Sequence, residues 1–244
     1  MPTFSDLGIP FPLFEAPAEE ASDYEGIASC RLCGGEGKHC FEAEVLIQPC
    51  SSCGAAVGHY FEARRDVPCR ACGTTMAFPE ALREKKRLLA CYDCLRAGKA
   101  AIGKDTEFGA VCWEEAAQGV THGVPGLRTE QFERVPIEPE EDWYGVRIPG
   151  EHLWELLRTP RFHSWQGERW LFCCREPMAY LGGWQDALES LRPEDPAAFF
   201  DAMFDPDDEA RAWGFESFEP GHSSCLYVYR CRTCDRRRAT WDCD

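Results

Sequence analysis

Residues 50–73 of the chain read CSSCGAAVGHYFEARRDVPCRACG. The stretch begins and ends with the same feature, a pair of cysteines that two residues separate and that a glycine follows directly. Two intervening residues let one tight turn direct both thiolates at a single ion about 2.3 Å away, and the glycine tolerates the positive φ with which the turn leaves the metal. Fifteen residues lie between Cys53 and Cys69, a gap typical of a zinc ribbon. We therefore assign Cys50, Cys53, Cys69 and Cys72 to one zinc ion.

Two further Cys-x-x-Cys pairs flank this ribbon. Cys30 and Cys33 precede it and are also followed by glycine, whereas Cys91 and Cys94 come after it and lead into Leu95, which indicates a helix. A closed structural zinc site has four ligands, so four pairs make two ions. If the ribbon cysteines share one ion, the two flanking pairs hold the other in a nested arrangement. A sequential pairing, the first pair with the second and the third with the fourth, has similar gap lengths and stays open.

A fifth pair, Cys231 and Cys234, lies near the C-terminus and has Asp235 in place of the glycine. Its candidate partners are nearby histidines and four cysteines: Cys173, Cys174, Cys225 and Cys243. Residues 170–174 read as a strand, and successive side chains of a strand point to opposite faces, so only one of the adjacent cysteines 173 and 174 is expected to share the ion. The alternative is that these are buried reduced cysteines that act as small apolar residues.

The chain has 244 residues, sixteen of them cysteine and eight tryptophan. Nine cysteines lie in the first hundred residues, and every tryptophan lies beyond residue 110. We therefore expect two structural units, an N-terminal one stabilised by its cysteines and a C-terminal one stabilised by packing of its aromatic residues. No basic leader precedes an apolar run near Met1, and nowhere do eighteen apolar residues stand together, which predicts a soluble, cytoplasmic protein without a membrane span. Thiols stay reduced in that compartment, so paired cysteines indicate metal rather than disulfides.

These features predict an α+β fold in which a zinc-ribbon module with short strands precedes a mixed α+β domain. We expect an extended arm at residues 1–29 that packs Phe4, Phe11 and Phe14 onto a neighbouring part, the zinc-ribbon module at 30–108, an irregular linker at 109–149 and the C-terminal domain at 150–244. Within the module we expect strands at 40–47 and 55–62, a helical turn at 79–82 and a helix at 93–102.

The C-terminal domain shows clearer periodicity. Leu153, Leu156 and Leu157 lie on one face of a helix predicted at 151–158, which Pro160 ends. Further helices are predicted at 184–191, 196–204 and 207–213, and strands at 170–174, 226–231 and 238–242.

The formal net charge is −16 and the sequence pI is about 4.8. Such a surface repels phosphate backbones, so nucleic-acid binding is disfavoured. It speeds encounter with a basic protein through long-range steering that salt weakens, and residues 138–142 and 205–209 are the candidate contact regions. The alternative is that the charge only maintains solubility.

The sequence shows no set of residues typical of an active site. Four thiolates on one ion leave no position for water, so a closed site is not catalytic. The six histidines form no metal-spaced pair, and Cys40 and Cys112 are most simply core residues. We therefore predict a non-enzymatic protein. An enzyme that uses an open metal position among Cys173, Cys174, Cys231 and Cys234 is the alternative from another class.

The chain contains an ordered series of short motifs: Cys91 to Ala101 with Phe108, Arg158-Thr159-Pro160, Trp165 to Leu171 with Cys174, Tyr180-Leu181-Gly182 and Tyr229 to Cys234. In this order the motifs resemble the bacterial CbrC family of colicin-tolerance proteins. The resemblance spans residues 90–244, with Cys30/Cys33 as its N-terminal anchor. It implies that the pairs 30/33 and 91/94 belong together and that residues 50–72 are an inserted ribbon, which favours the nested pairing. Tyr92-Asp93 replaces the family's usual Pro-Trp, and Cys173 stands where a histidine is common.

The founding member of that family is associated with tolerance to a nuclease colicin, and no catalytic chemistry defines the family. The charge, the resemblance and the lack of a reaction centre together predict a toxin-tolerance or immunity protein whose acidic surface captures a basic bacterial toxin domain of the nuclease type. We expect two zinc ions, and a third if Cys174, Cys231 and Cys234 bind one. The alternative function is a zinc-ribbon regulatory or nucleic-acid-associated factor, supported only by the basic clusters 64–65, 83–87 and 236–238.

Overall fold

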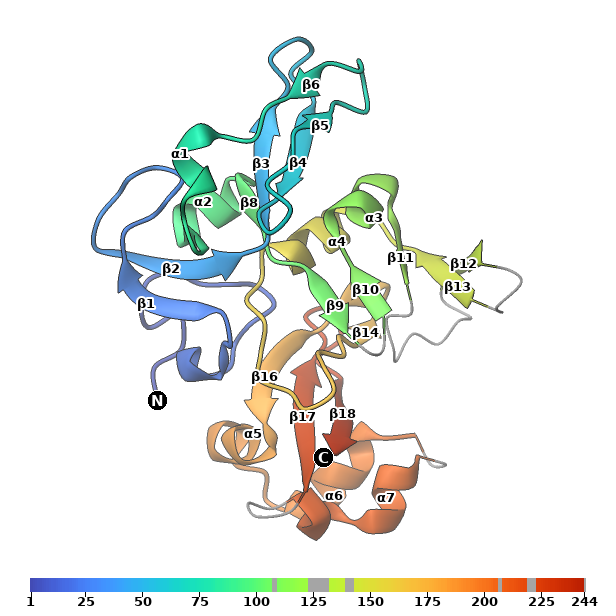
Figure 1. Cartoon of the computed structure of the whole chain (residues 1–244). Helices are drawn as coiled ribbons and strands as arrows, with labels where there is room; N and C mark the ends of the chain where they lie inside the picture. Colours follow the sequence, from blue (N-terminus) through green and yellow to red (C-terminus); the bar gives the residue numbers. More distant parts are fainter. Residues whose placement is uncertain (107–108, 123–131, 139–142, 206–207, 219–222, 244) are drawn as a thin grey trace.

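The computed structural model describes residues 1–106, 109–122, 132–138, 143–205, 208–218 and 223–243 and has the predicted α+β architecture (Figure 1). The N-terminal half builds two small antiparallel sheets and a hairpin. The sheets have the strand orders β1-β2-β7 and β4-β3-β8, and β5 pairs with β6 at the tip of the ribbon. The elements are β1 (Tyr24–Ala28), β2 (Lys38–Ala43), β3 (Val45–Pro49), β4 (Ala56–Tyr60), β5 (Val67–Pro68), β6 (Thr75–Met76), α1 (Glu80–Arg83), β7 (Leu88–Cys91), α2 (Tyr92–Arg96) and β8 (Ala100–Ala101).

Residues 109–149, expected to be an irregular linker, contain regular structure. The chain forms β9 (Lys104–Thr106), β10 (Gly109–Val111), α3 (Trp113–Gln118), β11 (Val120–His122), β12 (Glu133–Glu138) and β13 (Trp143–Arg147). β11, β13 and β12 pair in that order as an antiparallel sheet. The proline, glycine and acidic residues that suggested a loop lie partly in 123–131 and 139–142, outside the described residues, and do not prevent the strands between them.

The C-terminal elements include every predicted helix and strand, together with two strands that were not predicted, at Glu176–Pro177 and Ala179–Gly183. They are α4 (Gly150–Leu157), β14 (Phe172–Cys173), β15 (Glu176–Pro177), β16 (Ala179–Gly183), α5 (Trp184–Leu191), α6 (Pro196–Met203), α7 (Glu209–Trp213), β17 (Ser224–Arg230) and β18 (Arg237–Cys243). Two helices begin at aspartates, because Asp195 accepts a hydrogen bond from the Ala198 N–H and Asp208 accepts one from the Ala210 N–H, each at 3.0 Å. The strand predicted at 170–174 is shorter than expected, and the helix predicted at 93–102 ends at Arg96.

The sheet β16-β17-β18 separates two hydrophobic cores. Leu226 and Val228 of β17 pack with helices α5, α6 and α7 on one face, whereas Tyr227 and Tyr229 face the rest of the protein. This alternation follows from the two-residue period of a strand. The larger core draws buried residues from both halves of the chain, so the cysteine module and the C-terminal sheet share one interior.

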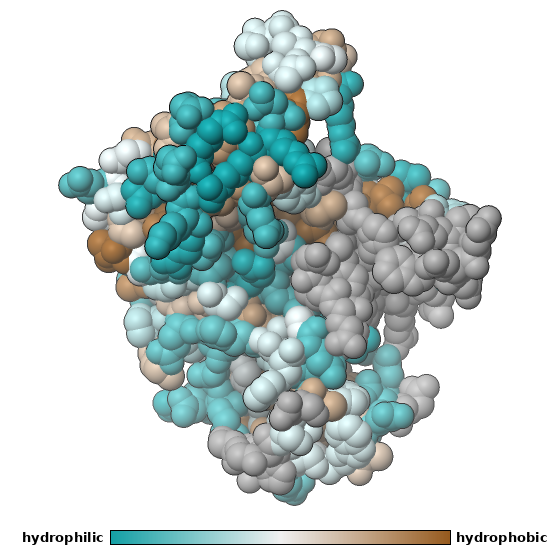
Figure 2. All heavy atoms as spheres, in the orientation of Figure 1, coloured by the Kyte–Doolittle hydropathy of each residue, from teal (hydrophilic) through white to brown (hydrophobic). Residues whose placement is uncertain are grey.

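The N-terminal arm packs its phenylalanines as expected. Phe4, Phe11 and Phe14 are buried, and Phe14 forms a bridge with Tyr180 of β16. The arm is held further by the Glu15 N–H, which donates to the Tyr180 carbonyl at 2.8 Å. Figure 2 shows mainly hydrophilic side chains over the face around α1 and α2. None of the helices in the described residues has the length and apolar character that a membrane crossing requires.

Candidate metal centres

The structure gathers twelve cysteines into three groups of four. The groups are Cys30, Cys33, Cys91 and Cys94; Cys50, Cys53, Cys69 and Cys72; and Cys173, Cys174, Cys231 and Cys234. Within each group all four sulfur atoms lie within 4.8 Å of one another. The four N-terminal pairs are therefore arranged in the nested order, and the sequential pairing is wrong.

The spacing of the sulfur atoms fits tetrahedral thiolate coordination and excludes disulfides. Sulfur–sulfur distances within the groups include 3.8 and 3.9 Å in the first, 3.6 Å twice in the second, and 3.9 and 3.6 Å in the third. Four sulfurs at about 2.3 Å from a central zinc ion would lie about 3.8 Å apart, whereas a disulfide bond is about 2.05 Å long. None of the sixteen cysteines forms a disulfide. The donor set of each group therefore fits a four-coordinate thiophilic ion.

Four Cys-x-x-Cys turns share one hydrogen-bond pattern. In each, the N–H of the residue after the second cysteine donates to the carbonyl of the first, and the N–H of the first donates to the carbonyl five residues on; the pairs begin at Cys30, Cys50, Cys69 and Cys231. The residue after the second cysteine has positive φ in every case. The predicted role of glycine is confirmed at Gly34, Gly54 and Gly73, with φ of 70°, 75° and 75°.

The first centre joins such a turn to the junction of β7 and α2. Cys91 ends β7 and Cys94 lies in α2, so a strand-to-helix turn replaces the second knuckle. Cys30, Cys91 and Cys94 are buried in the larger core. The backbone N–H of Cys91 donates to Cys30 Sγ at 3.2 Å, which helps to hold a thiolate in this interior position.

The second centre lies at the tip of the ribbon. One knuckle connects β3 to β4 and the other connects β5 to β6, and the small cluster around Cys50 and Cys69 adds only Val57 as a further buried residue. Cys53 and Cys72 are exposed. Little hydrophobic burial supports this end of the ribbon, so an ion would supply much of its stability.

The third centre corrects the expectation that only one of the adjacent cysteines would share an ion. Cys173 ends β14, and Cys174 and Arg175 form the turn to β15, with φ of 53° and 66°. Two central residues with positive φ are typical of a type I′ hairpin turn. The alternation of a strand does not apply in a turn, so both sulfurs reach Cys231 and Cys234.

Cys173 is thus the candidate ligand that sequence reasoning omitted. Its sulfur lies 3.6 Å from that of Cys234. A signal for it was present in the family resemblance described above, which puts a histidine at this position, because cysteine and histidine both serve as zinc ligands. Cys174, Cys231 and Cys234, the predicted members, all belong to the group.

Each centre contains one thiol whose pKa is lowered. Burial raises the pKa of Cys30, but hydrogen bonds from the backbone N–H groups of Cys91, Cys33 and Leu32 outweigh burial and bring the pKa to about 7. The hydroxyl and N–H of Thr74 lower the pKa of Cys72 to about 6. The backbone N–H of Arg236 lowers that of Cys234 to about 7. Each group therefore offers one thiolate near neutral pH with which binding of a cation can begin.

The remaining cysteines lie outside the three groups. Cys40 is fully buried beside the first centre, and burial raises the pKa of its thiol to about 11, as suits a core residue. Cys225 and Cys243, considered as partners for the third centre, lie at the far end of the β17–β18 pair from Cys231. The predicted assignment of the grouped thiols as metal ligands remains a prediction.

The comparisons with known proteins give a family and no closer relative. A family model described as "Uncharacterised protein family (UPF0167)" matches residues 41–243, more than half of the chain. The same family is also called CbrC. A search of the curated proteins and a search of the solved structures found no match.

Proposed function

The chain belongs to the uncharacterised protein family UPF0167. We propose that it is a non-enzymatic zinc protein. Three zinc ions, each bound by four thiolates, stabilise the fold that presents a protein-binding surface. The observation that carries the proposal is the approach of four sulfurs to within 4.8 Å of one another at three separate places. Soft thiolate ligands in tetrahedral geometry select zinc or iron among common metals. Zinc needs no redox partner and is the usual ion of paired Cys-x-x-Cys turns.

A structural role follows from the ligand count. Four thiolates complete the coordination of zinc, so no position is left for a water or a substrate. This argues against the alternative of a metal-dependent enzyme at the third centre, because the inclusion of Cys173 closes the site that three cysteines would have left open. Thiolate ligands also need a reducing compartment, which supports the expected cytoplasmic location.

We propose further that the binding partner is a basic protein, and that it is a toxin domain of the nuclease type. The support is the formal net charge of −16 and the colicin-tolerance association of the family that the motifs resemble. The structure weakens the case for the contact region 205–209, because its acids already have partners within the protein. Asp205 lies 4.0 Å from Arg236 and 3.9 Å from Arg238, and Asp208 caps α7. Residues 139–142 of the other region lie outside the described residues.

The nucleic-acid alternative loses support from the pairing of its basic clusters. Arg83 forms ion pairs with Asp66 and Glu80. Arg87 pairs with both Glu25 and Glu42, and Arg236 and Arg238 share Asp205. Guanidinium groups that already face carboxylates release fewer counterions from a phosphate backbone, so they contribute less to nucleic-acid affinity.

Metal analysis of the purified chain tests the three-ion proposal. We expect three zinc ions per chain, and two in the variant Cys173→Ser, because a closed site that loses one of four thiolates binds zinc far more weakly. Cys225→Ser is the matched control, since Cys225 is a partly buried thiol outside the groups, and it should retain three ions. A protein that is prepared under reducing conditions and contains no transition metal would overturn the proposal.

Binding to purified basic nuclease toxin domains tests the choice of partner. We expect an affinity for at least one domain encoded beside the gene, and an association rate that falls as salt rises, because long-range charge attraction is screened within about 10 Å at 0.1 M salt. Duplex DNA at the same salt should bind more weakly. Failure to bind any such domain at low salt, in a protein that carries its metal, would refute the toxin proposal and leave the zinc proposal intact.

A further inference from the structure

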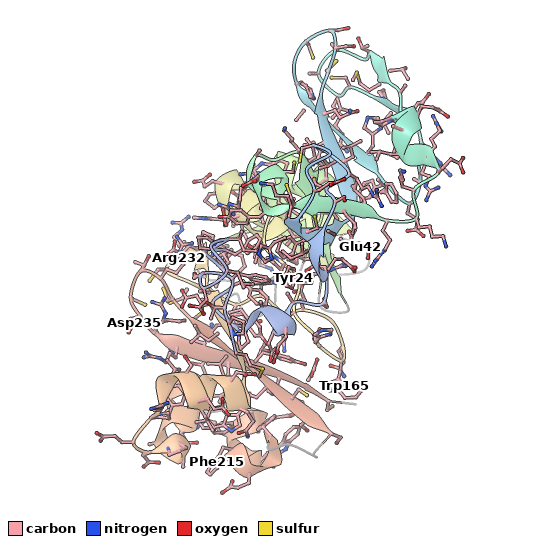
Figure 3. The ribbon with its side chains drawn as sticks, turned by 90° about the vertical axis from the view of Figure 1, so that its left-hand side faces the viewer. Tyr24, Glu42, Trp165, Phe215, Arg232 and Asp235 are labelled. Carbon is pink, nitrogen blue, oxygen red and sulfur yellow. The ribbon has the colours of Figure 1, made fainter. Side chains whose placement is uncertain are left out.

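A pocket of about 560 Å³ lies where the N-terminal arm, the segment around residues 163–165 and the C-terminal sheet meet. Its lining includes Glu20, His163, Trp165, Trp184 and Asp186. Figure 3 shows Trp165 at the opposite end of the β17–β18 strand pair from Arg232 and Asp235, which flank the third metal centre. The pocket is therefore separate from the cysteine groups, and its volume lies within the range of small-ligand sites.

Two carboxyl groups meet in this pocket. Glu20 and Asp186 both line the pocket, and Glu20 Oε2 accepts a hydrogen bond from the Tyr180 hydroxyl at 2.9 Å. Burial and the neighbouring Asp186 raise the pKa of Glu20 to about 7, so below neutral pH a cation would have to displace a proton from the Glu20 carboxyl. A Cβ on Gly183 would lie 3.8 Å from Glu20 Oε1 and 3.9 Å from Asp186 Oδ2, so the glycine leaves both carboxyls open to the pocket.

Trp165 stands at the edge of the pocket in a fixed orientation. Its side chain is 60% exposed, yet its indole N–H donates to Cys225 Sγ at 3.0 Å. The backbone N–H groups of Trp165 and Gln166 both donate to Oδ2 of the buried Asp242, at 2.8 and 3.1 Å. The indole is therefore exposed, but the buried Asp242 carboxylate fixes its backbone. Such an arrangement suits contact with a ligand, because little conformational entropy is lost on binding.

The other walls of the pocket are apolar and carry no compensating positive charge. Phe218 and Leu226 contribute hydrophobic surface, and no lysine or arginine is among the described residues that line the pocket. Trp184 is 3% exposed, and its indole N–H finds no acceptor within the described part of the chain. The pocket thus has mainly apolar walls, two carboxyl groups at one end and the exposed Trp165 indole at its rim.

We propose that this pocket binds an organic cation, a guanidinium or ammonium group on an apolar body. The Glu20–Asp186 pair takes the charged group by charge-assisted hydrogen bonds, and the exposed face of Trp165 stacks on it. The cation is supplied either by a small molecule or by an arginine side chain of a protein. This proposal goes beyond the zinc proposal and does not depend on the identity of the protein partner.

Calorimetry on the full zinc-loaded chain tests the cation site with benzamidine as the probe and benzamide as its neutral counterpart. We expect benzamidine to bind at least about tenfold more tightly than benzamide, because only the former makes charge-assisted hydrogen bonds. Its affinity should rise as pH increases through 7, with release of a proton, since the cation displaces the proton of the Glu20–Asp186 pair. The other titratable groups at this site are Tyr180, which donates to Glu20, and His163, Cys225 and Tyr227, which line the pocket.

Three variants locate the binding. Glu20→Gln should abolish the preference for benzamidine over benzamide, and Gly183→Ala, whose new methyl makes only ordinary contacts, should weaken binding by occupying the space between the carboxyls. Trp165→Ala should weaken binding by about two- to fivefold. Glu19→Gln is the matched control, because Glu19 is exposed and does not line the pocket, and it should bind as the natural protein does. Equal affinity for the two probes, or equal binding by Glu20→Gln and Glu19→Gln, would overturn the proposal.

Competition assigns the source of the cation. A blocked Ala-Ala-Arg-Ala-Ala peptide that displaces benzamidine supports the site and indicates an arginine of a protein partner. A peptide that leaves benzamidine bound, while the free amine agmatine displaces it, supports the site and indicates a small molecule. Failure of both to displace benzamidine would contradict the proposed ligand class. The metal content is measured on the same samples. A sample that contains its zinc but binds no cation contradicts the cation proposal alone.

Discussion

Asp235 occupies the position that glycine holds in the other three knuckles. Its φ is 61°, and its N–H donates to the Cys231 carbonyl at 3.0 Å. Aspartate is among the few side chains that adopt this left-handed conformation at modest cost. Its carboxylate also lies 3.3 Å from Arg230 and 3.8 Å from Arg237. The third centre therefore uses side-chain ion pairs to hold a turn that the other centres leave to glycine.

A second residue-scale feature is a buried group of charges between the arm and the core. Lys104 is 3% exposed, donates to the Thr159 carbonyl at 2.7 Å and lies 3.7 Å from Glu168 Oε2. Glu168 accepts a hydrogen bond from the Phe162 N–H at 2.7 Å. Burial raises the pKa of Glu168 to about 7 and that of nearby Asp23 to about 6, although Lys104 opposes both shifts. Burial also lowers the pKa of Lys104.

This arrangement predicts the pH dependence of stability. A carboxyl whose pKa is raised in the folded state binds a proton there that the unfolded chain has already released, so the free energy of unfolding falls as pH rises from about 4.5 to 7. Glu168→Gln should reduce this fall, whereas Glu19→Gln at the surface should not. Urea unfolding at pH 5, 6 and 7 measures the difference, and zinc release contributes equally to all three proteins. Equal pH profiles for Glu168→Gln and the natural protein would contradict the raised pKa.

At the scale of elements, the conformation of each Cys-x-x-Cys turn was easier to predict than which cysteine pairs share an ion. The knuckles at Gly34, Gly54 and Gly73 were predictable because their turns depend only on residues within the turn. The ribbon spacing and the family resemblance both favoured the nested order, but the similar gaps between the pairs left the sequential order open. Cys173 was missed because a β14–β15 hairpin of two residues per strand has no period to reveal where the strand ends.

The same limit applies to the sheet β11-β13-β12. Its three strands are three to six residues long, and β12 contains Pro136, which normally argues against a strand. Their pairing across the sequence is set by tertiary contacts rather than by local propensity. In contrast, α4 and α5 each show a helical stripe that faces a core, so their positions were predicted to within a residue or two.

The first and second centres should respond differently to loss of one ligand. Cys33 and Cys53 are matched, since each is the exposed second cysteine of a knuckle. The partners of Cys33 belong to the larger core, whereas those of Cys53 belong to the small cluster at the ribbon tip. Cys33→Ser should therefore lower the stability of the whole chain, and Cys53→Ser should open only the ribbon tip.

Hydrogen exchange separates the two outcomes. In Cys53→Ser we expect faster exchange confined to β5, β6 and the turns after Cys50 and Cys69, with unchanged protection in β2 and β17. In Cys33→Ser we expect faster exchange in β1, β2 and β7 and a lower unfolding midpoint. The assignment of the ribbon tip as a separate stability unit would be wrong if Cys53→Ser lowered protection throughout the protein.

At the scale of the whole molecule, the N-terminal arm connects the cysteine module to the C-terminal sheet. Phe4 packs against Phe41 of β2 with ring centroids 5.4 Å apart, and Phe14 packs against Tyr180 of β16 at the same distance. Phe4 and Phe14 also contact each other, at 5.4 Å. Four buried rings, one from β2, two from the arm and one from β16, thus form a continuous path between the two sheets, which predicts that the two halves unfold together.

Phe14→Ala tests this coupling. Truncation of a fully buried phenylalanine costs about 3–5 kcal/mol, and here the lost contacts belong to both halves, so both should be destabilised equally. All eight tryptophans lie beyond residue 110, so their fluorescence reports the C-terminal side, and hydrogen exchange of β2 and β7 reports the cysteine module. We expect both probes to shift to the same lower urea midpoint. Phe200→Ala is the control, because Phe200 lies in the separate core behind the sheet. It should move the fluorescence midpoint further than β2 protection. If Phe14→Ala shifted only one probe, the arm would stabilise one half alone, and the shared interior would not make the halves fold as a unit.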